Sequence, residues 1–290
     1  MRKISLVALF AALVMSVNAA DLWTGPKHVS WNDGGVQIAA TSFADAKAGD
    51  KIVVSYTAAS DGIEFKVMND HFDHLAGSRE AAWIGGDGAF EQFLTQSAVD
   101  SLKAYGLEII GANFTCSKVE LLEGKAELKE GFTVWTGYFW VDDEGGWKTL
   151  ELYWNGFAGV DWDNATALRI YTEAKGTDYI INVKENWEEA GQIAGQDEMT
   201  DGEGYKELAL TEDLRNKLAN AERWMIQFSH KELDKFNVTD VVLVGDFGPD
   251  DQAIDNTQLP QMKSLKLIEN GQLVIIKNGV KYNALGTEIK

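Results

Sequence analysis

The sequence is poor in cysteine, proline and histidine: its 290 residues contain one, three and four of them. The single cysteine, Cys116, excludes an intrachain disulfide framework. It also lies far from the first mature residue, where a lipoprotein would carry its anchor. Because residues 114–118 alternate as a strand does, we predict that Cys116 is a buried small side chain rather than a reactive thiol.

Basic residues are also scarce, since 26 Lys and Arg stand against 45 Asp and Glu and the net charge is −19. This deficit argues against nucleic acid and against an anionic membrane surface as partners, because both bind basic patches. A neutral polysaccharide is compatible with such acidity, and so is a bound cation.

Long apolar runs are absent after the start of the chain. Residues 1–20 predict a secretory signal peptide, with Arg2 and Lys3 as the charged start, Leu6–Val14 as the apolar stretch and small residues at the cleavage region. The apolar stretch is too short for a bilayer-spanning helix, so we predict a secreted or cell-surface protein without membrane insertion. Removal of Arg2 and Lys3 changes the formal charge from −19 to −21.

Common catalytic and cofactor motifs are missing as well. The absence of a Gly-x-Ser-x-Gly elbow, a phosphate loop and a zinc signature favours a protein that is not an enzyme and has no cofactor. His71 and His74 could bind zinc together if they lay on one helix face, but their segment is predicted to be a loop. Two acidic clusters could hold a structural calcium ion, since oxygen ligands suffice for it. One is residues 142–144, and the other is Asp197 with Asp201 and Glu203. The alternative for both is a solvated acidic loop.

The sequence does contain one pattern that occurs twice. Leu-Trp-Thr-Gly at Leu22–Gly25 returns as Val-Trp-Thr-Gly at Val134–Gly137, and further matching pairs follow in the same order. Trp135 follows Trp23 by 112 positions, and the last matched pair is 122 positions apart. This ordered drift indicates that a whole domain was duplicated and then received small insertions. A tandem duplication favours binding over catalysis, because linked weak sites gain avidity.

The local signals in each copy are mainly those of strands. β-branched and aromatic residues fill 51–57 and 167–172, and Ile63–Val67 alternates strictly. Segments 95–102 and 211–218 each begin with a threonine cap, which predicts one short helix of one or two turns per copy. We therefore predict an all-β protein of two tandem β-sandwich domains.

The domain boundaries follow from the repeat and from changes in composition. We predict a signal peptide (1–20), a first β-sandwich domain (21–124), a linker (125–131), a second β-sandwich domain (132–247) and a linker with a C-terminal hairpin tail (248–290). In the tail, the pairs Asn270-Gly271 and Asn278-Gly279 separate β-forming runs and predict a small three-stranded meander. So small a unit suits an address or docking role.

Several motifs of the first copy resemble a known module. They are Leu22–Gly25, the Phe-Ala-x-Ala-Lys-Ala-Gly-Asp turn at Phe43–Asp50, the strand Ile52–Tyr56, and Gly106–Gly111 before Val119–Leu121. Together they resemble the jelly-roll, galactose-binding-like carbohydrate-binding module found beside glycoside hydrolases in Bacteroidetes. The second copy lacks the Ala-Gly-Asp turn and the Gly-x-x-Ile-x-Gly motif. Residues 278–290 are similar to C-terminal segments of exported Bacteroidetes proteins, some of which are sorting signals.

Aromatic side chains near turns are the candidate ligand-binding residues, because Trp offers a flat, rigid surface to a sugar ring. We predict five such residues in loops or at strand ends: Trp31, His71, Trp83, Trp147 and Trp187. The alternative for each is a ring folded under its loop. For Trp23 and Trp135, which begin equivalent strands, packing in or beside the core is the favoured interpretation.

Three functions are compatible with these observations. The first is non-catalytic binding of a polysaccharide or glycan at the cell surface or outside the cell, which requires exposed Trp31, Trp147 and Trp187. The second is an adhesin or surface-structural protein that binds a protein partner through a flat apolar patch. The third is a glycoside hydrolase, which requires two carboxylates facing each other at about 5–10 Å. Glu91 and Glu207 are a carboxylate pair at matching positions.

Overall fold

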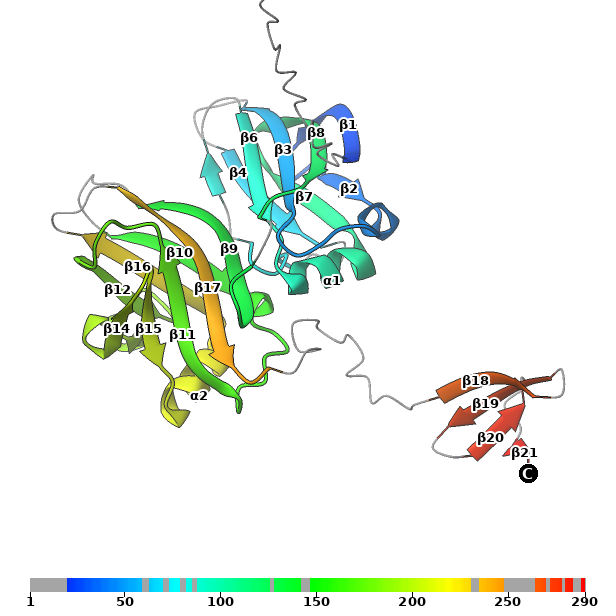
Figure 1. Ribbon diagram of the computed structural model, residues 1–290. Coiled ribbons are helices and arrows are strands. Elements are labelled where there is room, and N and C mark those ends of the chain that lie inside the picture. The colour runs from blue at the N-terminus through cyan, green and yellow to red at the C-terminus, as the bar shows by residue number, and fades with distance from the viewer. Residues whose placement is uncertain are drawn as a thin grey trace, which may run out of the picture. The chain divides into compact units, whose positions relative to one another are not determined.

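The computed structural model describes two compact units, residues 1–252 and 253–290 (Figure 1). The described residues are 20–58, 63–69, 73–78, 82–84, 88–125, 128–141, 147–230, 235–247, 264–269, 272–277, 280–283 and 288–289. For 63–65, for 82–84 and from residue 264 onwards, only the backbone is described. The predicted signal peptide lies outside these ranges, except for Ala20.

The first unit begins with a β-sandwich, here called the first sandwich, whose two sheets have the strand orders β1-β8-β3-β6 and β2-β7-β4-β5. Its strands are β1 (Ala20–Val29), β2 (Val36–Ile38), β3 (Lys51–Ala58), β4 (Ile63–Met68), β5 (Ala82–Ile84), β6 (Gly88–Phe93), β7 (Leu107–Ala112) and β8 (Phe114–Leu122). Helix α1 (Gln96–Tyr105) and the short 3-10 helix Ala40–Phe43 complete it. All of the strand pairs are antiparallel.

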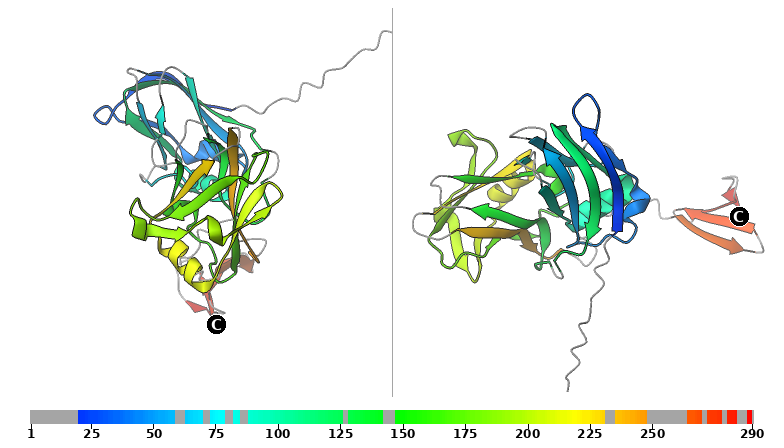
Figure 2. Two further views of the ribbon diagram at one scale, coloured as in Figure 1. Left: turned by 90° about the vertical axis from the view of Figure 1, so that its left-hand side faces the viewer. Right: turned by 90° about the horizontal axis from the view of Figure 1, so that it is seen from above.

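The second sandwich follows directly, with the strand orders β14-β15-β11-β17-β9 and β10-β16-β12-β13. Its strands are β9 (Phe132–Val141), β10 (Lys148–Tyr153), β11 (Ala165–Thr172), β12 (Tyr179–Lys184), β13 (Gln192–Ala194), β14 (Met199–Gly202), β15 (Tyr205–Ala209), β16 (Arg223–His230) and β17 (Phe236–Gly245), and its helix is α2 (Glu212–Asn220). Figure 2 shows the layered sheets of both sandwiches. Apart from β14, an extra edge strand, each sheet repeats the strand order of its counterpart in the first sandwich.

Each sandwich encloses its own hydrophobic core. Buried side chains between Val29 and Leu121 form one cluster, and those between Phe132 and Leu243 form the other. The predicted burial of Cys116 and Trp135 is confirmed, and Trp23 is partly buried against the first core. Burial raises the pKa of the Cys116 thiol to about 11, so it is neutral and unreactive near neutral pH.

The two α-helices begin where the sequence predicted but are longer than one or two turns. The hydroxyl of Thr95 accepts a hydrogen bond from the backbone N–H of Ala98, and Thr211 accepts one from Leu214. Helix α1 has ten residues and α2 has nine. Helix α1 ends at Gly106, whose φ of +85° is strained for a residue with a Cβ.

The second unit is a four-stranded antiparallel meander of β18 (Ser264–Glu269), β19 (Gln272–Lys277), β20 (Val280–Asn283) and β21 (Glu288–Ile289). Glu269 pairs with Gln272, and Lys277 pairs with Val280. Each register leaves two residues for the turn, as the Asn-Gly pairs predict. The meander has one strand more than the three that the sequence predicted.

Candidate functional site

Three of the five predicted ligand-binding residues have exposed side chains. Trp31, in the turn after β1, is 54% exposed, and Trp147 and Trp187 are 49% and 59% exposed. The Nζ atom of Lys66 lies 5.7 Å from the centre of the Trp31 ring. Trp83 lies in β5, where only the backbone is described, and pairs with Glu64. His71 lies outside the described residues.

The structure does not bring the predicted residues together. Trp31 and Trp83 belong to the first sandwich, whereas Trp147 and Trp187 belong to the second. Trp147 comes just before β10, at the level of the Lys148–Phe228 pair. Trp187 follows Lys184, which pairs with Met225, three residues before Phe228 on β16. Trp147 and Trp187 therefore lie at opposite ends of their sheet.

A different aromatic surface lies on β9, the edge strand of the five-stranded sheet. The side chains of Tyr138 and Trp140 are 57% and 51% exposed, while Phe139 between them is buried. Because side chains alternate along a strand, Tyr138 and Trp140 point from the same face, away from the core. Two large exposed rings on one strand favour an interaction surface over packing within the chain.

Beside Tyr138 the five-stranded sheet is hollowed by a pocket of about 320 Å³, called the sheet pocket below. It is lined by Lys125, Lys129, Tyr138, Tyr171, Thr172, Glu173, Glu203, Gly204, Thr239 and Asp240. Its volume is at the lower end of the range for small-molecule sites, about 300–1,000 Å³. The lining combines aromatic rings with hydrogen-bonding groups of both signs.

Two lysines of the predicted linker help to form the sheet pocket. Lys125 Nζ donates to the backbone carbonyl of Thr239 at 2.7 Å and lies 3.2 Å from Oδ1 of the buried Asp240. It also lies 5.1 Å from the centre of the Tyr138 ring. Burial lowers the pKa of Lys125, and the charge of Asp240 opposes that shift. Lys129 Nζ lies 5.0 Å from the centre of the Tyr171 ring.

Planar polar groups stand next to Trp140. Asn237 on β17 is the register partner of Trp140. Its amide Nδ2 donates to Oε2 of Glu173 at 3.0 Å. Beside an exposed ring, the amide can donate to and accept from the hydroxyl groups of a stacked ligand, and the carboxylate can accept from them.

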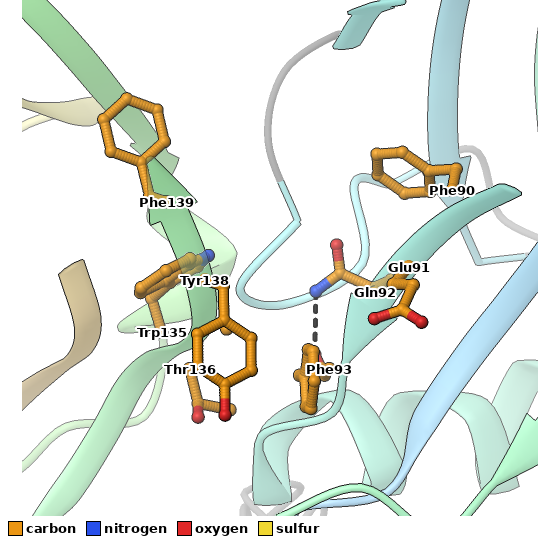
Figure 3. Close-up of a pocket in the computed structure, with 9 residues that line it drawn as sticks. Phe90, Glu91, Gln92, Phe93, Trp135, Thr136, Tyr138 and Phe139 are labelled. Carbon is orange, nitrogen blue, oxygen red and sulfur yellow. Dashed lines mark hydrogen bonds between the residues drawn. The ribbon is translucent and has the colours of Figure 1, made fainter. Parts of the chain in front are cut away.

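A second cavity, of about 150 Å³, lies between β6 and β9 and is called the junction pocket below. Figure 3 shows side chains of β6, from Phe90 to Phe93, opposite side chains of β9 that include Trp135 and Tyr138. The rings of Phe93 and Tyr138 meet edge to face, with centroids 5.6 Å apart. Tyr138 therefore lines both pockets.

The carboxylates weighed for hydrolysis are engaged with cations. Glu91 pairs with Lys51 at 2.7 Å, and Glu207 pairs with Arg169 at 2.6 Å. Glu91 lies on the strand that pairs with β3, and Glu207 lies on the strand that pairs with β11. These are equivalent positions of the two sandwiches. They belong to different sandwiches, so they do not form a facing pair within one copy.

The metal alternatives gain no support from the described residues. No group of three or more His, Cys, Asp and Glu side chains is placed to hold a metal ion in that part of the chain. Of the acidic residues considered for calcium, Asp201 pairs with Lys206, and 142–144 lie outside the described ranges. His74 instead stacks on Tyr153, with ring centroids 4.5 Å apart. Within the described ranges, no helix has the length and apolar character needed to cross a bilayer.

Comparison with known proteins gives only distant structural similarity. No protein-family model and no curated protein matches the chain. It is similar to SGBP-B of a Bacteroides ovatus mixed-linkage glucan utilization locus, solved with a mixed-linkage heptasaccharide, at 20% identity and a TM-score of 0.32 over 36% of this chain and 28% of that one. The chain thus covers 28% of the length of SGBP-B.

Two further solved structures share more of their length with the chain. A conserved Pseudomonas aeruginosa protein of unknown function is 12% identical, with a TM-score of 0.21 over 73% of this chain and 78% of that one. A Parabacteroides distasonis protein thought to be secreted is 7% identical, with a TM-score of 0.22 over 78% and 87%. All of these TM-scores are low, so the function proposed below depends on the surface of this chain.

Proposed function

We propose that the protein binds a polysaccharide or glycan outside the cell without catalysing a reaction, and that the ligand lies on the outer surface of the five-stranded sheet. We call this surface the Tyr138 face; it comprises Lys125, Lys129, Tyr138, Trp140, Tyr171, Glu173, Glu203 and Asn237. The observation that carries the proposal is the exposure of Tyr138 and Trp140 on one strand beside a polar hollow.

The chemistry of the Tyr138 face suits a sugar. A pyranose ring has an apolar face of C–H groups that packs on an aromatic ring, and a rim of hydroxyl groups that both donate and accept hydrogen bonds. Tyr and Trp provide large rigid contact areas at low cost in conformational entropy. Asn237, Glu173 and the lysine ammonium groups supply the polar partners of the hydroxyl groups.

The residues predicted from the sequence remain proposed contact points for glycan. Trp31 and Trp187 are exposed on separate parts of the surface, as a second site on either sandwich would require. His71, Trp83 and Trp147 belong to the same proposal. The secreted or cell-surface location also remains a proposal, and it derives from the predicted signal peptide.

Calorimetric titration against a panel of soluble neutral polysaccharides tests this function, with Trp140→Ala as the central variant. Loss of its stacking contact is expected to weaken binding about tenfold, the equivalent of about 1.4 kcal/mol. Tyr138→Phe, which keeps the ring, should retain the affinity of the parent. Trp154→Ala is the matched control, because Trp154 is similarly exposed and does not line the Tyr138 face.

The titration separates the competing interpretations. If Trp31→Ala or Trp187→Ala abolishes binding and Trp140→Ala does not, the ligand site lies at the predicted loop residues instead of the Tyr138 face. Failure of every polysaccharide to bind the folded protein would refute glycan binding. That result would favour an adhesin with a protein partner.

A further inference from the structure

We infer that the two sandwiches build one composite groove, in which a single extended, unbranched and uncharged oligosaccharide contacts β6 of the first sandwich and the five-stranded sheet of the second. This inference rests on the proposed glycan-binding function and specifies the ligand of the same site. It differs from the expectation that duplicated domains carry two independent sites.

The first observation is that the junction pocket and the sheet pocket share one residue. Tyr138 lines the pocket of about 150 Å³ toward β6 and the pocket of about 320 Å³ toward β11. Glu91 and Phe93 form the far side of the first, and Tyr171 and Glu203 form the far side of the second. A ligand that fills both pockets passes over Tyr138.

The second observation is a row of aromatic rings that crosses the strands. Phe93 on β6 contacts Tyr138 on β9 at a centroid distance of 5.6 Å, and Tyr171 on β11 contacts Tyr205 on β15 at 5.2 Å. Because β17 lies between β9 and β11, Tyr138 and Tyr171 are separated by two strand spacings across the sheet, about 10 Å. Tyr138 is also two residues along β9 from Thr136, the position level with Tyr171. One sugar ring cannot cover both side chains at that separation, so a ligand that stacks on both must contain several sugar units.

The third observation is that specific contacts hold the two sandwiches together beside the groove. Lys125 lies against the ring of Phe93 on one side and bonds to Thr239 and Asp240 on the other. Within the first sandwich, Gln92 donates to the carbonyl of Gly77 at 3.1 Å and so holds Gly77 in place. A Cβ at Gly77 would lie 3.3 Å from the carbonyl oxygen of Val134, so the sandwiches approach closely there.

The charges along the groove point to an uncharged ligand. Lys125 and Lys129 are balanced by Glu91, Glu173, Glu203 and the buried Asp240. The whole chain carries a net charge of −19. A polyanionic chain would be repelled on average, whereas hydroxyl groups can bond to both signs of charge.

The experiment is calorimetric titration of the full-length protein with cello-, manno- and xylo-oligosaccharides, each from disaccharide to octasaccharide. For the series that binds, we expect one ligand per chain and an affinity that rises with length until the groove is filled. Glu91→Ala and Phe93→Leu should weaken the binding of the longest member several-fold and leave the shortest unchanged. Lys118→Ala, on the first sandwich away from both pockets, is the control.

The outcomes are distinct for the two proposals. Two ligands per chain with an affinity independent of length, or insensitivity of the longest ligand to both substitutions, would overturn the composite groove and leave glycan binding intact. Absence of binding for all three series would overturn both. Glu91 is partly exposed, so Glu91→Ala keeps the test decisive if the less exposed Phe93 proves necessary for folding.

Discussion

At the scale of single residues, Lys206 places a charged group in the interior of the second sandwich. It is 1% exposed, its Nζ lies 2.5 Å from Oδ1 of Asp201, and it lies 4.7 Å from the centre of the Tyr179 ring. The hydroxyl of Thr172 donates to the Tyr179 oxygen at 3.0 Å, and burial raises the pKa of that phenol. A buried ammonium is costly unless it is paired, so these contacts offset its desolvation.

We expect Asp201→Ala to destabilise the protein more than Lys206→Met does. The first change leaves a buried ammonium without its carboxylate, at a cost of about 1–3 kcal/mol because Asp201 is partly exposed. The second removes the charge and keeps most of the side-chain volume. Urea unfolding at neutral pH measures both. Lys217→Ala, which breaks the exposed pair with Asp213, is the control and should cost under about 0.5 kcal/mol. Equal costs for Asp201→Ala and the control would contradict this account.

The sequence predicted the exposure of Trp31, Trp147 and Trp187, but not which exposed rings share one surface. Trp31 and Trp187 stand beside polar or glycine-rich residues, and that local context was sufficient. Tyr138 escaped, and Trp140 could not be singled out among the other tryptophans, because seven of the ten residues of β9 are apolar or aromatic and no alternation marks its outer face. Their exposure depends on β9 being an edge strand with an irregular register near Thr136, which only the paired sheet reveals.

At the scale of elements, the two helices follow equivalent caps but differ in how deeply they are buried. Helix α1 buries four residues, Ser97, Ala98, Val99 and Leu102, whereas α2 buries only Leu218. Thr95 is fully buried and Thr211 is exposed. The sequence predicted both caps from the threonines, and it underestimated the helix lengths because the later turns depend on tertiary packing.

Removal of the two caps should therefore have unequal effects. Thr95→Ala leaves the backbone N–H of Ala98 without its partner in the interior, and we expect a loss of about 1–2 kcal/mol. Thr211→Ala should cost about 0.5–1 kcal/mol, since water can reach the N–H of Leu214. Denaturant unfolding compares the two, and Thr95→Ser should restore most of the lost stability. A larger effect at Thr211 would show that burial does not govern these caps.

At the scale of the whole molecule, the two sandwiches share their strand order and details of their register. Trp23 pairs with Val119 in the first, and Trp135 pairs with Val241 in the second. These pairs combine residues matched between the two copies of the sequence pattern, which supports the proposal of a duplicated domain. The all-β fold could be predicted from strand periodicity. The contacts between the sandwiches could not, because Lys125, Gly77 and Tyr153 carry no local signal of their partners.

The proposed two-domain organisation predicts how core substitutions act on thermal unfolding. Leu102 on α1 and Leu218 on α2 occupy equivalent places, and both are fully buried, one in each core. Replacement of either by Ala should cost about 2–5 kcal/mol, because it removes apolar contacts and leaves a cavity. If each sandwich unfolds as its own unit, Leu102→Ala lowers one calorimetric transition by several degrees, and Leu218→Ala lowers a different one. A single transition that both variants lower equally would show that the sandwiches form one cooperative domain.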